Sequence, residues 1–263
     1  MNQVTPEEIQ WAKALKEAAE DDPRLDASAI SDTEFLQQAL VSKADTAKAL
    51  HRLGCLQKFK EQYGIHLDGS HEDGMRDMRI FQSTFPGFLL SMTELANHST
   101  LLCCDHQHFL GAKATSPESH AIIMRGLFYL LQAGNHNIPA IRAGWALLAD
   151  GKGMGWKNFS LPVEQKAAGL YGKAYPVRIQ RIIIMNANPL VVFLYNIIKL
   201  FLTKKVREKH SFVGELNGYL EASPFPQTVL PKLWNGNVKE NEFLQEFSRR
   251  LEERYDLVAK FRL

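Results

Sequence analysis

The chain has 263 residues, of which 45% are hydrophobic and 23% are charged. This composition is typical of a folded globular protein and excludes wholesale disorder. Lysine and arginine number 31 against 29 acidic residues, so the formal charge is only +2. A protein that coats nucleic acid carries far more positive charge. We therefore expect no nucleic-acid partner, and any basic site must be a local patch.

Cysteine usage and the two ends of the sequence indicate a reducing compartment. Three cysteines are too few for a disulfide framework, and Cys103 and Cys104 are neighbours that rarely bridge to each other. The N-terminal stretch is acidic and has no apolar run, so it predicts no secretory signal. The last four residues contain no prenylation cysteine. We expect a cytoplasmic protein.

The N-terminal part, residues 1–66, is predicted to be a helical cap. A helical stripe runs through Trp11, Leu15 and Ala18, and Asp32 is a plausible N-cap of a second helix. A third helix is expected from Thr46 to Tyr63, closed by Gly64. The polar loop from His66 to Gly74 predicts the boundary to a second domain, residues 67–263.

The second domain is predicted to alternate strands and helices. Strands are expected at residues 78–85, 87–92, 138–149, 175–185 and 211–213. Helices are expected at residues 116–133, 162–173, 189–209 and 238–263. This alternation predicts an α/β fold with a mostly parallel sheet behind an all-helical N-terminal segment.

The apolar stretch from Ile182 to Leu202 is long enough to cross a bilayer. Three asparagines, Pro189 and Lys199 would be costly there, and the turn Asn186–Pro189 divides the stretch into a strand and a helix. The helix from Leu190 to Leu202 has almost no polar face. Such a helix is either a central core helix or a lid over a lipid pocket.

A group of basic residues follows that helix and also occupies the strand before it. Its members are Arg178, Arg181, Lys204, Lys205, Arg207 and Lys209. Cations at the C-terminal end of a helix complement the helix dipole. They also suit anionic head groups, where each contributes roughly 1 kcal/mol to membrane binding. Both interpretations remain open at this point.

The segment YPVRIQRIIIMNANPLVVFLYNIIKLFLTKKVREK, followed by VLPKLWNGN, resembles the CRAL-TRIO lipid-binding family. Members have a Tyr/Phe-Pro, a strand ending in Asn, an apolar gate helix and a Leu-Pro motif before two glycines. Within the family, the likeness is to the α-tocopherol and retinaldehyde transfer proteins. This sequence departs from the family pattern at several places. Asn235-Gly236 replaces the two glycines, and Gln180 occupies a position that is often basic in tocopherol carriers. The N-terminal segment lacks the usual Arg-rich run and keeps only Lys43 there. These departures bear most on phosphoinositide binding.

The resemblance implies an internal lipid pocket under the gate helix. Tyr175, Ile179 and Ile182 match pocket positions of the tocopherol carriers. Helical and strand periodicity adds other candidates to the pocket. These are Met124, Leu127, Phe128, Leu131, Trp145, Leu147, Ala149, Leu170, Tyr171, Val191, Leu194 and Ile197. For each of these residues the alternative is ordinary core packing.

Two further motifs favour no particular chemistry. The residues Cys103–His108 are capable of binding metal, but structural zinc sites use two separated ligand pairs and a second pair is missing. The loop Asp150–Gly155 fits neither the Walker nor the dinucleotide spacing, so a turn is expected. Neither a nucleophile elbow nor a catalytic triad is evident. We therefore expect no metal, no cofactor other than a bound lipid, and no enzymatic activity.

The sequence thus predicts a lipid-binding and transfer protein that carries a tocopherol, retinoid, carotenoid or phospholipid and docks transiently on anionic membranes. A patch of Arg178, Arg181, Lys205, Arg207 and Lys209 would make the membrane contact. The alternative is a lipid-responsive adaptor, which senses a lipid and binds a protein partner without transferring the lipid.

Overall fold

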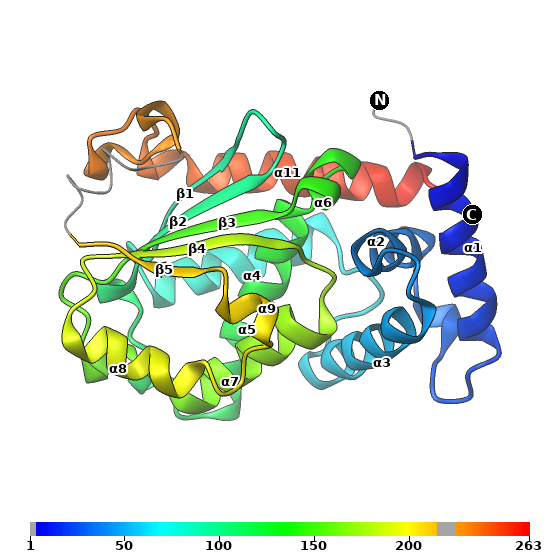
Figure 1. Ribbon diagram of the computed structural model, residues 1–263, viewed down its shortest axis with the longest axis horizontal. Helices are drawn as coiled ribbons and strands as arrows, with labels where there is room; N and C mark the ends of the chain where they lie inside the picture. The colour runs from blue at the N-terminus through cyan, green and yellow to red at the C-terminus, as the bar shows by residue number, and fades with distance from the viewer. Residues whose placement is uncertain (1–3, 215–224) are drawn as a thin grey trace.

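The computed structural model describes residues 4–214 and 225–263, so residues 1–3 of the predicted cap and 215–224 within the predicted second domain lie outside the described residues. A central sheet runs across the molecule, with the cap helices at one end and further helices on both sides (Figure 1). The fold class is therefore confirmed as α/β with an N-terminal helical segment. The domain boundary after residue 66 stays a prediction.

The cap consists of α1 (Pro6–Glu20), η1 (Ala27–Ala29), α2 (Asp32–Ser42) and α3 (Thr46–Tyr63). Ala12, Leu15 and Ala19 form the buried stripe of α1, so the stripe ends at Ala19 and not at Ala18. Ser31, and not Asp32, is the N-cap of α2, because its hydroxyl accepts from the Glu34 amide. Gly64 ends α3 in the left-handed conformation, as predicted.

Residues 78–85, predicted as a strand, belong instead to helix α4 (His71–Thr84). Ser70 caps this helix, and Met78 and Phe81 lie three residues apart on one buried face. The segment 78–85 is too short for its apolar residues to distinguish the spacing of a helix from the alternation of a strand. Helix α4 packs beside α5 (Pro117–Gly134).

The sheet of the described residues has the order β1-β2-β3-β4-β5. Its strands are β1 (Leu89–Glu94), β2 (Thr100–Asp105), β3 (Trp145–Asp150), β4 (Ile179–Met185) and β5 (His210–Phe212). β1 is antiparallel to β2, and the remaining neighbours are parallel. Residues 138–143, expected at the start of a strand, form helix α6 (Ile138–Ala143), capped by Asn137. Gly144, with φ 86°, then turns the chain into β3.

The helices after β3 position the candidate site. They are η4 (Trp156–Asn158), α7 (Leu161–Gly169), a π-helical turn η5 (Leu170–Ala174), α8 (Pro189–Ile198) and α9 (Lys204–Arg207). The predicted single helix 189–209 is therefore wrong. It is broken between Ile198 and Thr203, where Thr203 caps α9 by accepting from the Val206 amide. The break separates the apolar part from the basic part.

The remaining elements are η2 (His106–His108), η3 (Gly111–Lys113), η6 (Gln227–Val229), η7 (Lys232–Trp234), η8 (Glu240–Glu242) and α11 (Phe243–Lys260). Buried side chains of α11 join the main core through Phe243, Phe247 and Leu251. Among the described helices, none is long and apolar enough to span a membrane.

Candidate lipid-binding site

The two faces of the sheet differ in how completely they are filled. On one face, Ala146, Leu148, Ile183 and Met185 pack with Leu230 and Trp234 in a closed cluster, and all are buried. The other face, which we call the helix face, carries Trp145, Leu147, Ala149, Ile182 and Ile184. Leu147 and Ile184 remain partly exposed, although β3 and β4 are internal strands with helices over this face (Figure 1).

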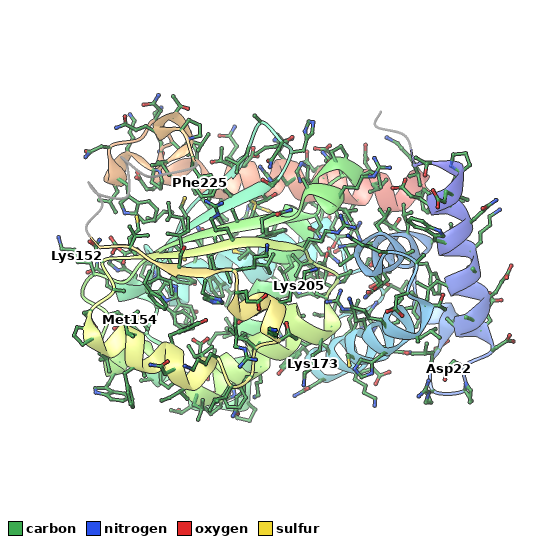
Figure 2. All side chains as sticks on the ribbon, in the orientation of Figure 1. Asp22, Lys152, Met154, Lys173, Lys205 and Phe225 are labelled. Atoms are coloured by element: carbon green, nitrogen blue, oxygen red, sulfur yellow. The ribbon has the colours of Figure 1, made fainter. Side chains whose placement is uncertain are left out.

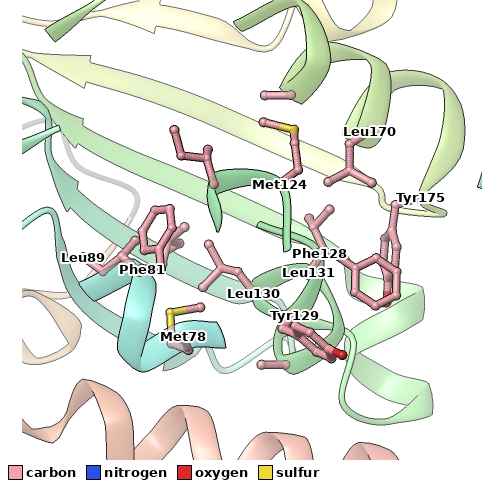
Figure 3. Packing of buried hydrophobic residues seen from close by; sticks show 14 of the residues in the cluster. Met78, Phe81, Leu89, Met124, Phe128, Tyr129, Leu130, Leu131, Leu170 and Tyr175 are labelled. Carbon is pink, nitrogen blue, oxygen red and sulfur yellow. The ribbon is translucent and has the colours of Figure 1, made fainter. Parts of the chain in front are cut away.

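Helix α5 fills its part of the helix face. Met124, Phe128 and Leu131 are buried in the main core, whereas Leu127 is partly exposed. The Phe128 ring lies 5.7 Å from the Tyr175 ring and 6.1 Å from that of Phe59, as centroid distances. Figure 3 shows Phe128 beside Tyr175 in this cluster. Phe128 therefore joins the domain to α3 of the cap.

Trp145 is also held by packing. It is only 4% exposed, and its indole N–H donates to Asn135 Oδ1 at 3.0 Å. A Cβ atom on Gly134 would lie 1.6 Å from the indole, so the close approach of α5 requires glycine there. Of the predicted pocket residues, Met124, Phe128, Leu131, Trp145, Ala149, Leu170, Tyr175, Ile182, Val191 and Leu194 are buried. Leu127, Leu147, Tyr171, Ile179 and Ile197 keep accessible surface.

Helix α8 covers the helix face with one side only. Leu194 is 1% exposed and Val191 is also buried, yet neither belongs to the three contiguous core clusters of the described residues. On the opposite side Phe193 is 52% exposed, and Leu200, just after the helix, is 72% exposed. Helix α8 is therefore not a central core helix, because its outer side faces solvent. The interpretation as a lid stays a prediction.

The N-terminal end of α8 is fixed by two asparagines. Asn188 caps the helix by accepting from the Val191 amide, and its Nδ2 donates to the Met154 carbonyl at 3.1 Å. The side-chain Nδ2 of Asn186 donates to Asp150 Oδ1 at 2.9 Å. Asp150 also accepts from the Lys152 amide, so the glycine-rich loop is a turn that anchors α8, and Figure 2 marks Lys152 and Met154 beside this end.

The basic patch extends further than the sequence indicated. Partial burial lowers the pKa of Lys205, and four neighbouring cations lower it further; these are Lys48, Lys43, Lys209 and Arg178. Lys43 and Lys48 belong to the cap, so the patch around Lys205 includes residues from both parts of the chain. Figure 2 labels Lys205. The sequence did not indicate Lys48 as a member of the patch, because Lys48 is far from Lys205 along the chain and only the fold brings the two together. Arg181 and Arg207 are exposed.

Arg178 has a second role in the structure. Its guanidinium donates to the Arg142 carbonyl at 3.0 Å and to the Leu40 carbonyl. Burial lowers its pKa. Arg178 therefore ties α2 and α6 to the start of β4, and only part of it is free to meet an anion.

Two surface hollows lie away from the helix face. The larger, of about 550 Å³, is lined by Gly87, Leu90, Asp105, His108, Lys232, Leu233 and Glu240. The smaller, of about 420 Å³, lies between α4 and α11, where Met75 and Leu244 line it. The predicted pocket residues line neither hollow. Within the described chain, no group of three potential ligands is placed to hold a metal ion, and Cys103 and Cys104 are buried in the sheet.

Residues that the sequence did not single out also contribute to this region. Trp156, on the loop before α7, is 61% exposed, and its ring centroid lies 6.1 Å from that of Phe193. Glu164 lies on α7 above the helix face. An apolar side chain on the water-exposed side of a fold leaves no periodic signal, which is why Trp156 was overlooked.

Comparison with known families decides the classification. A family model described as the CRAL/TRIO domain matches residues 104–236, about half of the chain. The chain belongs to the CRAL/TRIO family. This confirms the resemblance to the CRAL-TRIO family, whereas the likeness to the α-tocopherol and retinaldehyde transfer proteins stays a prediction. CRAL/TRIO domains form a lipid-binding and lipid-transfer family that is typically not enzymatic.

Solved structures agree at the level of the fold. The chain superposes on the crystal structure of Sfh5 with a TM-score of 0.57 and 13% sequence identity, covering 98% of this chain and 99% of that one. At this identity the likeness shows the CRAL/TRIO architecture and no more.

Curated relatives have the name tyrosine-protein phosphatase non-receptor type 9. The mouse protein is 26% identical over 240 residues, and the human protein is 25% identical over the same length. Each match covers 90% of this chain but only 38% of the relative. The phosphatase activity in their name therefore does not carry over to this CRAL/TRIO chain.

Proposed function

We propose that this CRAL/TRIO chain is a cytoplasmic carrier that holds one lipophilic molecule between the helix face of the sheet and α8. The observation that carries the proposal is the incomplete filling under α8. Leu147 and Ile184 keep accessible surface on internal strands, while Val191 and Leu194 are buried outside the contiguous core. Protein interiors are normally close-packed, so apolar side chains that keep accessible surface on internal strands support room for an apolar guest.

Burial of a lipid there would be favourable by roughly 25 cal/mol for each Å² of apolar surface removed from water. The partly exposed members of the predicted pocket are the best candidates for direct contact with the lipid. They are Leu127, Leu147, Tyr171, Ile179 and Ile197. The buried members, such as Phe128 and Trp145, would shape the wall behind them.

The outer side of α8 supports transient membrane contact. Trp156, Val192, Phe193, Leu200 and Phe201 are exposed apolar side chains on α8, on the turn after it and on η4. Lys205 and Lys209 follow them in the chain, with Lys43 and Lys48 nearby. An apolar patch beside a cationic patch matches the boundary between acyl chains and anionic head groups. Phosphoinositide head groups are one class of anion that this patch would accept.

The test combines identification of the lipid with transfer. Native mass spectrometry of the purified chain should show one lipid per protein, and the protein should accelerate exchange of that lipid between vesicles. Replacing Leu147 with Trp should exclude the lipid by filling the space, whereas replacing the buried Leu148 on the opposite face with Ile serves as the control. If the protein binds lipid without accelerating exchange, it is a lipid-responsive adaptor. If no lipid binds, the proposal is wrong.

A further inference from the structure

Glu164 is a carboxylate on a helix that faces the core. The apolar stripe of α7 consists of Val163, Ala167 and Leu170, which are buried in the main core. Glu164 lies one position along the helix from this stripe and is only partly exposed. Tyr171 follows seven residues later, which is about two helical turns, so the two side chains lie on one face. The α-helix widens into the π-helical turn η5 at Leu170–Ala174, a feature that often marks functional sites.

Neither side chain is satisfied by the protein. Within residues 4–214 and 225–263, the Glu164 carboxylate and the Tyr171 hydroxyl make no hydrogen bond or ion pair. Burial raises the pKa of Glu164 to about 7. Burial also raises the pKa of Tyr171, and the Glu164 carboxylate raises it further.

Other buried carboxylates in this chain have partners. Glu34 accepts from Lys60 Nζ at 2.9 and 3.0 Å, and Asp77 lies within 3.3 Å of the Arg76 guanidinium. A polar group that is largely removed from water and has no protein partner is costly, and proteins rarely keep one without a use. The unpaired oxygens of Glu164 and Tyr171 are not among the fully buried unpartnered atoms of the described residues, so they keep some accessible surface.

The position of the pair connects it with the proposed lipid cavity. Helix α7 contacts α5 on one side and α8 on the other. Leu170 packs in the same cluster as Met124 of α5 (Figure 3), and Leu147 of the sheet packs against that cluster. The segment that carries Glu164, on α7, and Tyr171, on η5, therefore lies among the elements that would enclose the lipid.

We propose that Glu164 and Tyr171 form the polar end of this cavity and select a lipid with a hydroxyl end group, that is, an alcohol. This inference rests on the proposed carrier function. A carboxylate accepts a hydrogen bond and a phenol donates one, and a hydroxyl satisfies both at once. A fatty acid would place a second carboxylate beside Glu164, which is unfavourable at pH 8, above the raised pKa of Glu164, where both groups are ionised. An ether of the same shape would leave Glu164 unpaired.

The test uses four probes with one C18 chain and one fluorescent label at its far end. Their polar ends are an alcohol, its methyl ether, a carboxylic acid and an amine. At pH 8 the wild-type chain should bind the alcohol at least about tenfold more tightly than the ether or the acid. Glu164→Leu should lose most of this preference and still bind the ether, whereas Gln165→Leu, at the exposed neighbour, should keep it. Tyr171→Phe should reduce the preference less.

Melting of the lipid-free protein gives an independent readout. At pH 8, Glu164→Leu should raise the melting temperature by about 2 °C or more, because the variant lacks an unpaired carboxylate whose charged form is disfavoured by partial burial. If wild type binds ether and alcohol equally, or if Glu164→Leu keeps the preference, the selection of an alcohol is wrong while the carrier function stands. If no probe binds and no phospholipid is transferred, both proposals are wrong.

Discussion

Helices α5 and α8 are both apolar and both cover the helix face of the sheet, but they are packed differently. Helix α5 buries Ile123, Met124, Phe128, Leu130 and Leu131 in the main core. Helix α8 buries Val191 and Leu194, and it exposes Val192 and Phe193 to solvent. Apolar composition alone therefore does not assign a helix to the core.

The difference follows from the contacts at the two helix ends. Helix α5 is capped by Ser116 and is held at its other end by the bond between Asn135 and Trp145. Helix α8 is anchored at its N-terminal end through Asn188, whereas near its other end the Tyr195 ring contacts the short strand β5, and the helix ends at Ile198. A helix that buries few side chains along its length opens at a lower free-energy cost than the core. We expect α8 to move and α5 to stay in place.

The largest expected effect comes from truncating one aromatic residue on each helix. Phe128→Ala should lower the free energy of unfolding by about 3–5 kcal/mol, because it leaves a cavity between α5, Tyr175 and Phe59. Phe193→Ala should change it by less than about 0.5 kcal/mol, because the ring is half exposed. Urea unfolding measures both. Similar losses in the two variants would show that α8 is part of the core.

Membrane binding should depend on the region around α8 and α9. Lys205→Glu should weaken binding to anionic vesicles about fivefold or more, and the wild-type affinity should fall as salt rises. Lys13→Glu makes the same charge change on the exposed side of α1 and should have little effect. Vesicle co-sedimentation measures the difference. Equal losses in the two variants would assign the binding to net charge and not to this patch.

Removing the N-cap side chains of α5 and α8 should change stability less than the aromatic truncations, and the two helices should respond differently. Ser116→Ala and Asn188→Ala each remove a side chain that accepts from a helix amide, at a cost of about 1 kcal/mol. For α5 this cost should appear in global unfolding. For α8 it should appear as faster hydrogen exchange limited to residues 189–198, with global stability nearly unchanged and lipid transfer faster. Loss of global stability in Asn188→Ala would contradict independent opening of α8.

The sequence predicted the fold class because helix caps, alternating elements and the Asn186–Pro189 turn are local signals. It erred at residues 78–85 and 138–143, where short apolar patterns fit both helix and strand until Ser70 and Asn137 are recognised as caps. The site was harder to predict. Whether Trp145 or Leu147 touches a guest depends on packing from α5 and α8, and the approach of Lys48 to Lys205 depends on how the cap docks.

The central claim is that α8 opens to release a lipid, and locking it shut tests this most directly. The Tyr195 ring of α8 lies 5.0 Å from the Phe212 ring of β5, as a centroid distance. Cysteines in place of these two residues can be joined by a bismaleimide whose linker contains a disulfide. Cys55 must be replaced, whereas burial raises the pKa of Cys103 to about 12 and protects that thiol from reaction, and Cys104 is likewise buried.

The cross-linked protein, loaded with lipid beforehand, should retain it in the presence of acceptor vesicles, and reduction of the linker should restore release. The single variant Tyr195→Cys without Cys55, treated with the same reagent, should release lipid throughout. If the linked protein and the reduced protein release the lipid at the same rate, the account is contradicted, because the lipid then leaves by a route that does not involve α8.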